Sequence, residues 1–248
     1  MREMALKGRH PMVWFIDSAG ARIEPGKNSE DAISQFAGQG HLFREEVIMS
    51  GVIPMVAAMV GPGAAGTAYI PGLADFVPMV KGNGSMALAG PPLVKAVTGE
   101  DVAEHVLGGS KVHCEVSGVG DVEYPDEESC IAATRKYLGF FPSSCDSPPP
   151  RAACDDPIDR REESLLDLVP DNPRRAYDMH KLLRAVVDHG DLFDLKPRWA
   201  RNLVTALARV DGRSVGIVAN NPMHLGGVPD IDAADKGARF IQLCDAFN

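Results

Sequence analysis

The chain has 248 residues, of which 45% are hydrophobic and 24% charged, which is a composition typical of ordinary globular domains. Its net charge of -9 repels nucleic acid and anionic membranes, so we expect neither as a partner. No apolar run approaches the roughly 20 residues that cross a bilayer, and the N-terminus lacks the apolar core of a signal peptide, so we expect a cytoplasmic or organellar protein.

The first half of the chain alternates predicted strands and helices. Residues 11–16 and 53–60 are apolar on both faces, which is typical of buried parallel strands, and each segment ends in a glycine-containing loop. The pattern predicts a helix over residues 32–50 between them, and a short helix after the second strand that stops near Pro71. Two further strands and a helix follow, at residues 76–80, 85–88 and 91–97. This order predicts an α/β layered core.

The second half begins where prolines and polar residues become frequent. Because this stretch cannot form a regular element, we divide the chain into a first domain (1–140), a Pro-rich linker (141–165) and a second domain (166–248). After the linker, Asn172-Pro173 predicts a helix start and Gly190 its end.

Two apolar segments of the second half, 203–210 and 214–219, are joined through Asp211-Gly212 and predict a β-hairpin. The chain then ends in a helix pattern. Because the chain ends within this helix pattern, we expect the apolar face of the helix to be partly exposed. That face consists of Phe240, Ile241, Leu243 and Phe247.

Five cysteines without any Cys-x-x-Cys pair argue against both a disulfide framework and a zinc ribbon, so we interpret them as reduced thiols. His105, His113 and Cys114 are the nearest approach to a metal cluster, but no fourth ligand stands at a recognisable spacing. We therefore expect no metal.

Gly61, Gly63 and Gly66 form the pattern G-x-G-x-x-G after a strand and before a helix, as in dinucleotide-binding proteins. That interpretation needs an acidic residue at the end of the next strand, where this chain has Lys81-Gly82-Asn83, and Pro71 leaves only a short helix behind the loop. An NAD-binding oxidoreductase stays as the weaker alternative.

The same turn also suits an oxyanion hole, in which backbone N–H groups face a substrate carbonyl and stabilise an enolate. Small residues are required so that the backbone can approach, and Ala64-Ala65-Gly66-Thr67 meets this requirement. Close packing of a helix on a strand explains the same small residues equally well.

Five motifs, taken in order, resemble the carboxyltransferase (beta) subunit of biotin-dependent acyl-CoA carboxylases, the group that includes the propionyl-CoA and methylcrotonyl-CoA enzymes. Singly each motif is weak, but together they cover most of the chain. They are Asp17-Ser18-Ala19-Gly20-Ala21-Arg22, Gly61-Pro62-Gly63-Ala64-Ala65-Gly66-Thr67-Ala68-Tyr69, Ala89-Gly90-Pro91-Pro92-Leu93-Val94-Lys95, Val97-Thr98-Gly99-Glu100-Asp101-Val102 and Lys236-Gly237-Ala238-Arg239-Phe240.

The resemblance implies a crotonase-like α/β fold, in which the N-domain is largely present and the C-domain only begun. It implies transfer of a carboxyl group from carboxybiotin to the α-carbon, or the vinylogous carbon, of an acyl-CoA through an enolate. The implied oxyanion donors are Ala65 and Gly66. The implied substrate-binding residues are Ser18, Ala19, Gly20, Arg22, Ala64, Thr67, Gly90, Pro91 and Lys95.

The resemblance also implies biotin carried on a partner protein, acyl-CoA as substrate, and biotin carboxylase and biotin carboxyl carrier subunits as partners. It further implies a dimer-based homo-oligomer, a hexamer in the full protein, in the bacterial cytoplasm or the mitochondrial matrix. Two alternatives remain open: a biotin-dependent acyl-CoA decarboxylase subunit, and a non-catalytic CoA-binding fragment. We expect this chain by itself to be inactive in the full reaction.

The chain departs from the family at two turns, where the family commonly has Gly-Gly and this chain has Ser18-Ala19-Gly20 and Ala65-Gly66. If the second turn requires a positive φ at position 65, alanine adds roughly 1 kcal/mol of strain there. Lys81, Lys95 and Lys111 are candidates for contacts with CoA phosphates, although surface lysines are usually only solvated.

Overall fold

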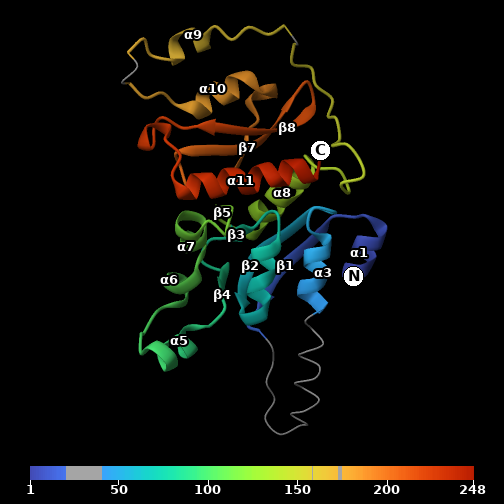
Figure 1. Ribbon diagram of the computed structural model, residues 1–248, viewed down its shortest axis with the longest axis vertical. Helices are drawn as coiled ribbons and strands as arrows, with labels where there is room; N and C mark the ends of the chain where they lie inside the picture. Colours follow the sequence, from blue (N-terminus) through green and yellow to red (C-terminus); the bar gives the residue numbers. More distant parts are fainter. Residues whose placement is uncertain (21–40, 158, 173–174) are drawn as a thin grey trace. The chain divides into compact units, whose positions relative to one another are not determined.

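The computed structural model describes residues 1–20, 41–157, 159–172 and 175–248. Its contacts divide the chain into two compact units, Met1–Arg135 and Lys136–Asn248, and the boundary falls inside helix α8 (Glu127–Leu138) (Figure 1). The Pro-rich segment 141–165 therefore belongs to the second unit. Arg22 and residues 32–40 of the helix predicted over 32–50 lie outside the described residues, and the rest of that prediction corresponds to α3 (His41–Met49).

A parallel sheet forms the centre of the first unit, with strands in the order β1-β2-β3-β5 and β4 paired to β2. The predicted α/β class with a parallel sheet is thus confirmed. The strands are β1 (Met12–Ser18), β2 (Met55–Ala64), β3 (Pro78–Val80), β4 (Ser85–Ala87) and β5 (Val122–Tyr124). Because β2 lies inside the sheet, Met55, Met59 and their neighbours are completely buried.

The first strand is less buried than the sequence predicts. In β1 only Ile16 is buried, and Phe15 is 55% exposed. The expectation of apolar contacts on both faces is wrong here; among the described strands, β1 lies at the end of the order β1-β2-β3-β5 and pairs with β2.

Short helices surround this sheet (Figure 1). They are α1 (Arg2–Gly8), α3 (His41–Met49), η1 (Ala65–Ala68), α4 (Tyr69–Leu73), α5 (Pro91–Thr98), α6 (Glu104–Gly108), α7 (Ser110–Val112) and η2 (His113–Ser117). The helix predicted from Pro91 is confirmed, with Gly99 capping it at a φ of 78°.

The second strand runs four residues further than predicted and continues through Gly61 and Gly63 to Ala64. A Cβ atom at Gly61 would lie 2.4 Å from Asp17 Oδ1, and one at Gly63 would lie 2.9 Å from Met59 Cε. These glycines therefore let a strand pack closely, and they do not form the predicted loop. The short helix predicted to stop near Pro71 is confirmed, since α4 ends at Leu73; Pro71 itself lies in the first turn of α4, where a missing N–H leaves no hydrogen bond unmade.

An antiparallel sheet in the order β6-β7-β8 forms the second unit together with two longer helices. Its elements are α9 (Ser164–Leu168), α10 (Met179–Val186), η3 (Asp188–Gly190), β6 (Phe193–Leu195), β7 (Leu203–Val210), β8 (Arg213–Asn220), η4 (Leu225–Gly227) and α11 (Ile231–Ala246). The predicted hairpin is confirmed: Asp211 and Gly212 join β7 and β8 with φ of 52° and 70°, as in a type I′ turn.

Two helix predictions in this unit need correction. Helix α10 begins at Met179, several residues after Asn172-Pro173, because Asp178 caps it by accepting a hydrogen bond from the His180 N–H. The apolar face of α11 is covered, since Phe240, Leu243 and Phe247 are all buried and the helix packs on β7 and β8. Of the four residues expected to lack cover, only Ile241 is exposed.

Candidate functional site

The chain makes an unusual turn where β2 ends. Ala64 is still extended, Ala65 has a φ of 54°, and residues 65–68 then form a single 3₁₀ turn. The left-handed conformation costs a residue with a Cβ roughly 1 kcal/mol, so position 65 carries the strain that its alanine implies. The first N–H groups of a helical turn have no partner within it, and Ala65 and Gly66 supply those groups here.

The loop after β1 lies against this turn. Ser18 pairs with Gly63 across the two strands, and Thr67 Oγ1 lies 3.4 Å from Ser18 Oγ and donates to the Ala64 carbonyl at 2.7 Å. The Gly20 N–H donates to Ser18 Oγ at 3.2 Å, and Gly20 has a φ of 96°. The Thr67–Ser18 hydrogen bond joins two segments 49 residues apart in sequence, and the other two bonds fix the local conformation of each segment.

A cavity of about 230 Å³ opens beside the turn. Four of the predicted substrate-binding residues line it: Ala19, Ala64, Gly90 and Pro91. Its other lining residues are Pro62, Gly63, Ser85, Ala87, Glu104, Leu107 and Gly108. The structure thus brings the two family turns and the Gly90-Pro91 segment to one place, while Gly66 lies on the side of α3, where an added Cβ would meet the Phe43 ring at 3.7 Å.

A larger cavity of about 1070 Å³ shares Pro62, Ser85 and Glu104 with the first. Lys81 and Lys111 both line it. Lys95 lines neither cavity and forms an ion pair with Asp101, with 2.7 Å between Nζ and Oδ2.

The sequence analysis missed two serine–carboxylate pairs in the wall of the larger cavity. Ser85 donates to Glu104 at 2.7 Å, and Ser110 donates to Glu123 at 2.5 Å. Each pair joins a strand to a helix across more than ten positions in sequence: Ser85 of β4 to Glu104 of α6, and Ser110 of α7 to Glu123 of β5. No local pattern in the sequence signals them.

The residues considered for a metal cluster have other contacts. The His113 ring lies 2.8 Å from Ser117 Oγ and 2.9 Å from the Met86 carbonyl oxygen, and burial lowers the pKa of this histidine. Cys114 is buried in the core. Within the described part of the chain, no group of three or more His, Cys, Asp or Glu side chains has an arrangement able to hold a metal ion. In the same part, no helix is both long and apolar enough to cross a membrane.

Comparison with known proteins adds a consistent set of similarities. A family profile described as "Carboxyl transferase domain" matches residues 1–248. The chain is 43% identical, over 100% of its length, to the methylmalonyl-CoA decarboxylase alpha subunit of Veillonella parvula, of which it covers 48%. It is 40% identical, over 99% of its length, to the propionyl-CoA carboxylase beta chain of Roseobacter denitrificans, of which it covers 47%.

Among solved structures, transcarboxylase 12S with methylmalonyl-coenzyme A and methylmalonic acid bound is similar over 100% of this chain and 47% of that one. The TM-score is 0.93 and the sequence identity 39%. A single-chain, multi-domain long-chain acyl-CoA carboxylase gives a TM-score of 0.79 at 28% identity, with 99% of this chain covered and 23% of that one. The chain spans about half the length of the curated relatives it matches.

Proposed function

The chain belongs to the carboxyl transferase domain family, whose profile it matches over residues 1–248, and from this membership we propose that its first unit holds an acyl-CoA thioester for carboxyl transfer. The fold is the crotonase-like α/β fold of that family. The observation that carries the proposal is the strained turn at Ala65, which directly follows Ala64 in the wall of the 230 Å³ cavity.

The proposed chemistry places the thioester oxygen at the N–H groups of Ala65 and Gly66. When the α C–H bond breaks, negative charge moves to this oxygen, and two fixed N–H dipoles stabilise the enolate. The α-carbon then forms a bond to the incoming carboxyl carbon. Ala64 and Ala65 have no side chain larger than a methyl group, so the backbone can approach the thioester closely.

Carboxybiotin on a carrier protein would supply the carboxyl group, and its ureido group would accept the α-proton as the C–N bond to the carboxyl group breaks. The small residues Ala19, Ala64 and Ala87 in the wall of the cavity fit the approach of a flat ring to the acyl group. Under this proposal the chain supplies donors and positioning, and none of its histidines acts as the base.

We place the phosphate groups of CoA in the larger cavity, near Lys81 and Lys111. In the described part of the chain, neither ammonium group has a hydrogen-bond or ion-pair partner. Two unpaired ammonium groups favour an anionic ligand there, whereas the ion pair with Asp101 occupies Lys95. The predicted role of Lys95 in substrate binding has correspondingly less support.

A decarboxylase subunit is a second candidate, and the 43% identity to the methylmalonyl-CoA decarboxylase alpha subunit favours it as strongly as the carboxylase relatives favour the first. Carboxyl transfer is reversible, so one site serves both directions. The proteins that co-purify with this chain distinguish them: a biotin carboxylase indicates carboxylation, and membrane subunits indicate decarboxylation.

We also propose the assembly implied by the family: a biotin carboxylase and biotin carrier as partners, and a dimer-based hexamer of the complete subunit. The hexamer described for transcarboxylase 12S supports this assembly. A bacterial cytoplasm or a mitochondrial matrix is the proposed location, supported by bacterial relatives and by a mitochondrial relative from Mus musculus.

Calorimetry on the 248-residue chain tests the substrate class. We expect propionyl-CoA to bind and NADH to give no heat, and we expect Lys81→Gln to weaken propionyl-CoA binding by about 5–10-fold, since one phosphate contact is lost. Lys95→Gln is the matched control and should leave the affinity unchanged. Binding of NADH without propionyl-CoA would support the dinucleotide alternative and contradict the proposal.

A further inference from the structure

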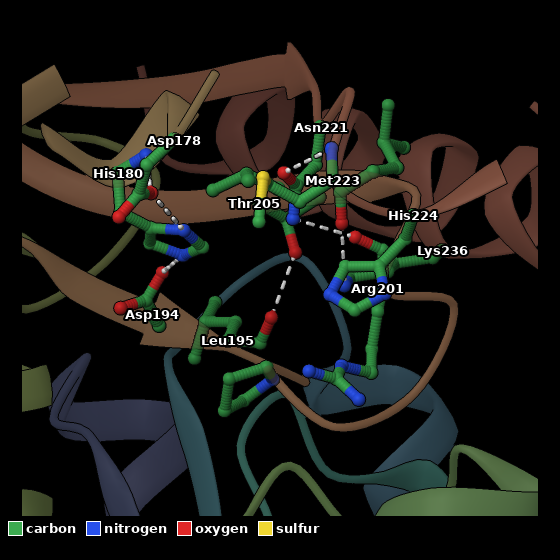
Figure 2. A pocket seen from close by; sticks show the side chains of 13 residues that line it. Asp178, His180, Asp194, Leu195, Arg201, Thr205, Asn221, Met223, His224 and Lys236 are labelled. Atoms are coloured by element: carbon green, nitrogen blue, oxygen red, sulfur yellow. Dashed lines mark hydrogen bonds and ion pairs between the residues drawn. The ribbon is translucent and has the colours of Figure 1, made fainter. Parts of the chain in front are cut away.

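The second unit contains a separate cavity of about 240 Å³, shown in Figure 2. Parts of α10, β6, β7 and α11 line it, together with the loop before β7 and the segment after β8. The charged residues that line the cavity form two groups on opposite sides of it. Asp178, His180 and Asp194 are on one side, and Arg201, His224 and Lys236 are on the other (Figure 2).

On the acidic side, the carboxylates already have a cationic or donor partner in His180. The His180 Nε2 atom lies 3.0 Å from Asp194 Oδ1, and Nδ1 lies 3.8 Å from Asp178 Oδ1. Asp178 also accepts the His180 backbone N–H at 3.0 Å as the cap of α10. One histidine balances at most one of the two negative charges of Asp178 and Asp194, so we expect an anionic ligand to bind on the opposite side of the cavity.

On the basic side, Lys236 is only 2% exposed, and its ammonium group, which has three N–H donors, lies within hydrogen-bond distance of four backbone carbonyl oxygens. These belong to Lys196, Trp199, Ala200 and Leu203, at distances of 2.8, 2.9, 3.3 and 2.7 Å. Carbonyl oxygens carry no net charge, so these bonds leave the positive charge of Lys236 in place. They also wrap the loop 196–203 around the ammonium group.

Arg201 lies in that loop and His224 follows β8, and both side chains line the cavity. In the described part of the chain, neither side chain has a hydrogen bond or an ion pair. Desolvation lowers the pKa of His224, and the positive charges of Arg201 and His180 lower it further. Arg201 is thus the charged group with the largest effect on this imidazole.

We propose that this cavity is an oxyanion-binding site, in which Arg201 and His224 hold a phosphate or carboxylate group and Lys236 stands behind them. The planar Arg201 guanidinium has the donor geometry for two parallel hydrogen bonds to such a group. The His224 ring supplies a further N–H. All the residues of this site belong to the second unit, and the proposal does not depend on the turn at Ala65.

NMR on the isotope-labelled 248-residue chain tests the site. Sodium phosphate and sodium acetate are titrated separately, each at an ionic strength held constant with NaCl, while the His224 ring resonances are followed. We expect saturation of the His224 shift at up to about 50 mM anion and a higher pKa for His224 in the bound state, because an anion stabilises the charged ring. The order of the two dissociation constants identifies the preferred group.

Arg201→Gln should weaken the binding at least about 10-fold, since it removes the charge-assisted donors. Arg184→Gln is the matched control, because Arg184 is exposed on α10 and does not line the cavity. An unchanged His180 resonance in each variant verifies the fold. The proposal is overturned if neither anion saturates the His224 shift, or if Arg201→Gln binds as tightly as the Arg184→Gln control.

Discussion

Ala65 is the residue on which the proposed chemistry depends, and its φ of 54° is a conformation that glycine adopts far more readily. Strain of this kind persists only where the surrounding structure holds it. Here the Thr67 to Ala64 hydrogen bond and the neighbouring Ser18 and Gly20 fix the turn. Ala65 is exposed, so its methyl group strains the backbone but buries little apolar surface.

Replacement of this alanine measures the strain directly. We expect Ala65→Gly to raise the free energy of unfolding by up to about 0.5 kcal/mol, because the left-handed strain that is removed slightly exceeds the conformational entropy that glycine costs. Urea denaturation provides the measurement. Ala96→Gly, on the exposed face of α5, is the matched control and should lower the free energy of unfolding by about 0.5–1 kcal/mol. A loss of stability in both variants would show that Ala65 is unstrained.

The sequence analysis identified the small residues of the turn as a candidate site, but not the charged groups around it. Small residues and glycines can be read from a local motif, and in the structure hydrogen bonds join Ser18, Gly20, Ala64 and Thr67. The pairs Ser85–Glu104 and Ser110–Glu123 each depend on a helix lying against a strand, and the ion pair of Lys95 depends on a side-chain conformation. None of these has a signature in sequence spacing.

At the scale of elements, close backbone packing positions the cavity beside the turn. Gly108 ends α6 against β4, and a Cβ at this position would lie 2.1 Å from the Met86 carbonyl oxygen. No small adjustment relieves a contact with backbone of this kind. The close packing of α6 against β4, which forms one wall of the cavity, therefore requires glycine at position 108.

We expect Gly108→Ala to lower the free energy of unfolding by about 2–4 kcal/mol because α6 must move away from β4. Hydrogen exchange should then show faster exchange in α6 and β4. Gly72→Ala, in α4, is the control: a Cβ there meets nothing within 4 Å, so alanine should be neutral or stabilise by up to about 1 kcal/mol. Equal stability of the two variants would refute the packing argument.

Element prediction succeeded where one local signal acted alone. The Asp211-Gly212 turn and the Pro91 helix start are examples, since a turn residue or a cap decides each of them. It failed where tertiary packing decided. Gly61 and Gly63 signalled a loop, yet the proximity of Asp17 and Met59 makes them strand residues. Similarly, α10 begins at its Asp178 cap and not at Asn172-Pro173.

For the whole molecule, the family match extends over both units, and the chemistry that we propose lies in the first. Ala19, Ala64 and Gly90, from three of the family motifs, line one cavity, while Lys236 organises a loop in the second unit. The buried ammonium group of Lys236 and its four carbonyl acceptors were not predictable, because their partners lie more than 30 residues away in sequence.

The most direct test of the central claim compares two variants of Gly66 in their affinity for an enolate mimic. A CoA derivative with a nitroalkyl group in place of the acyl group ionises to a nitronate, which carries a negative oxygen where the enolate oxygen forms. Gly66→Pro removes the N–H donor, and Gly66→Ala adds a similar Cβ toward Phe43 but keeps the donor. We predict that the preference for the nitronate over propionyl-CoA falls by about 10²-fold in Gly66→Pro and is retained in Gly66→Ala, with both variants folded by circular dichroism. An undiminished preference in a folded Gly66→Pro variant would contradict the assignment of this turn as the oxyanion site.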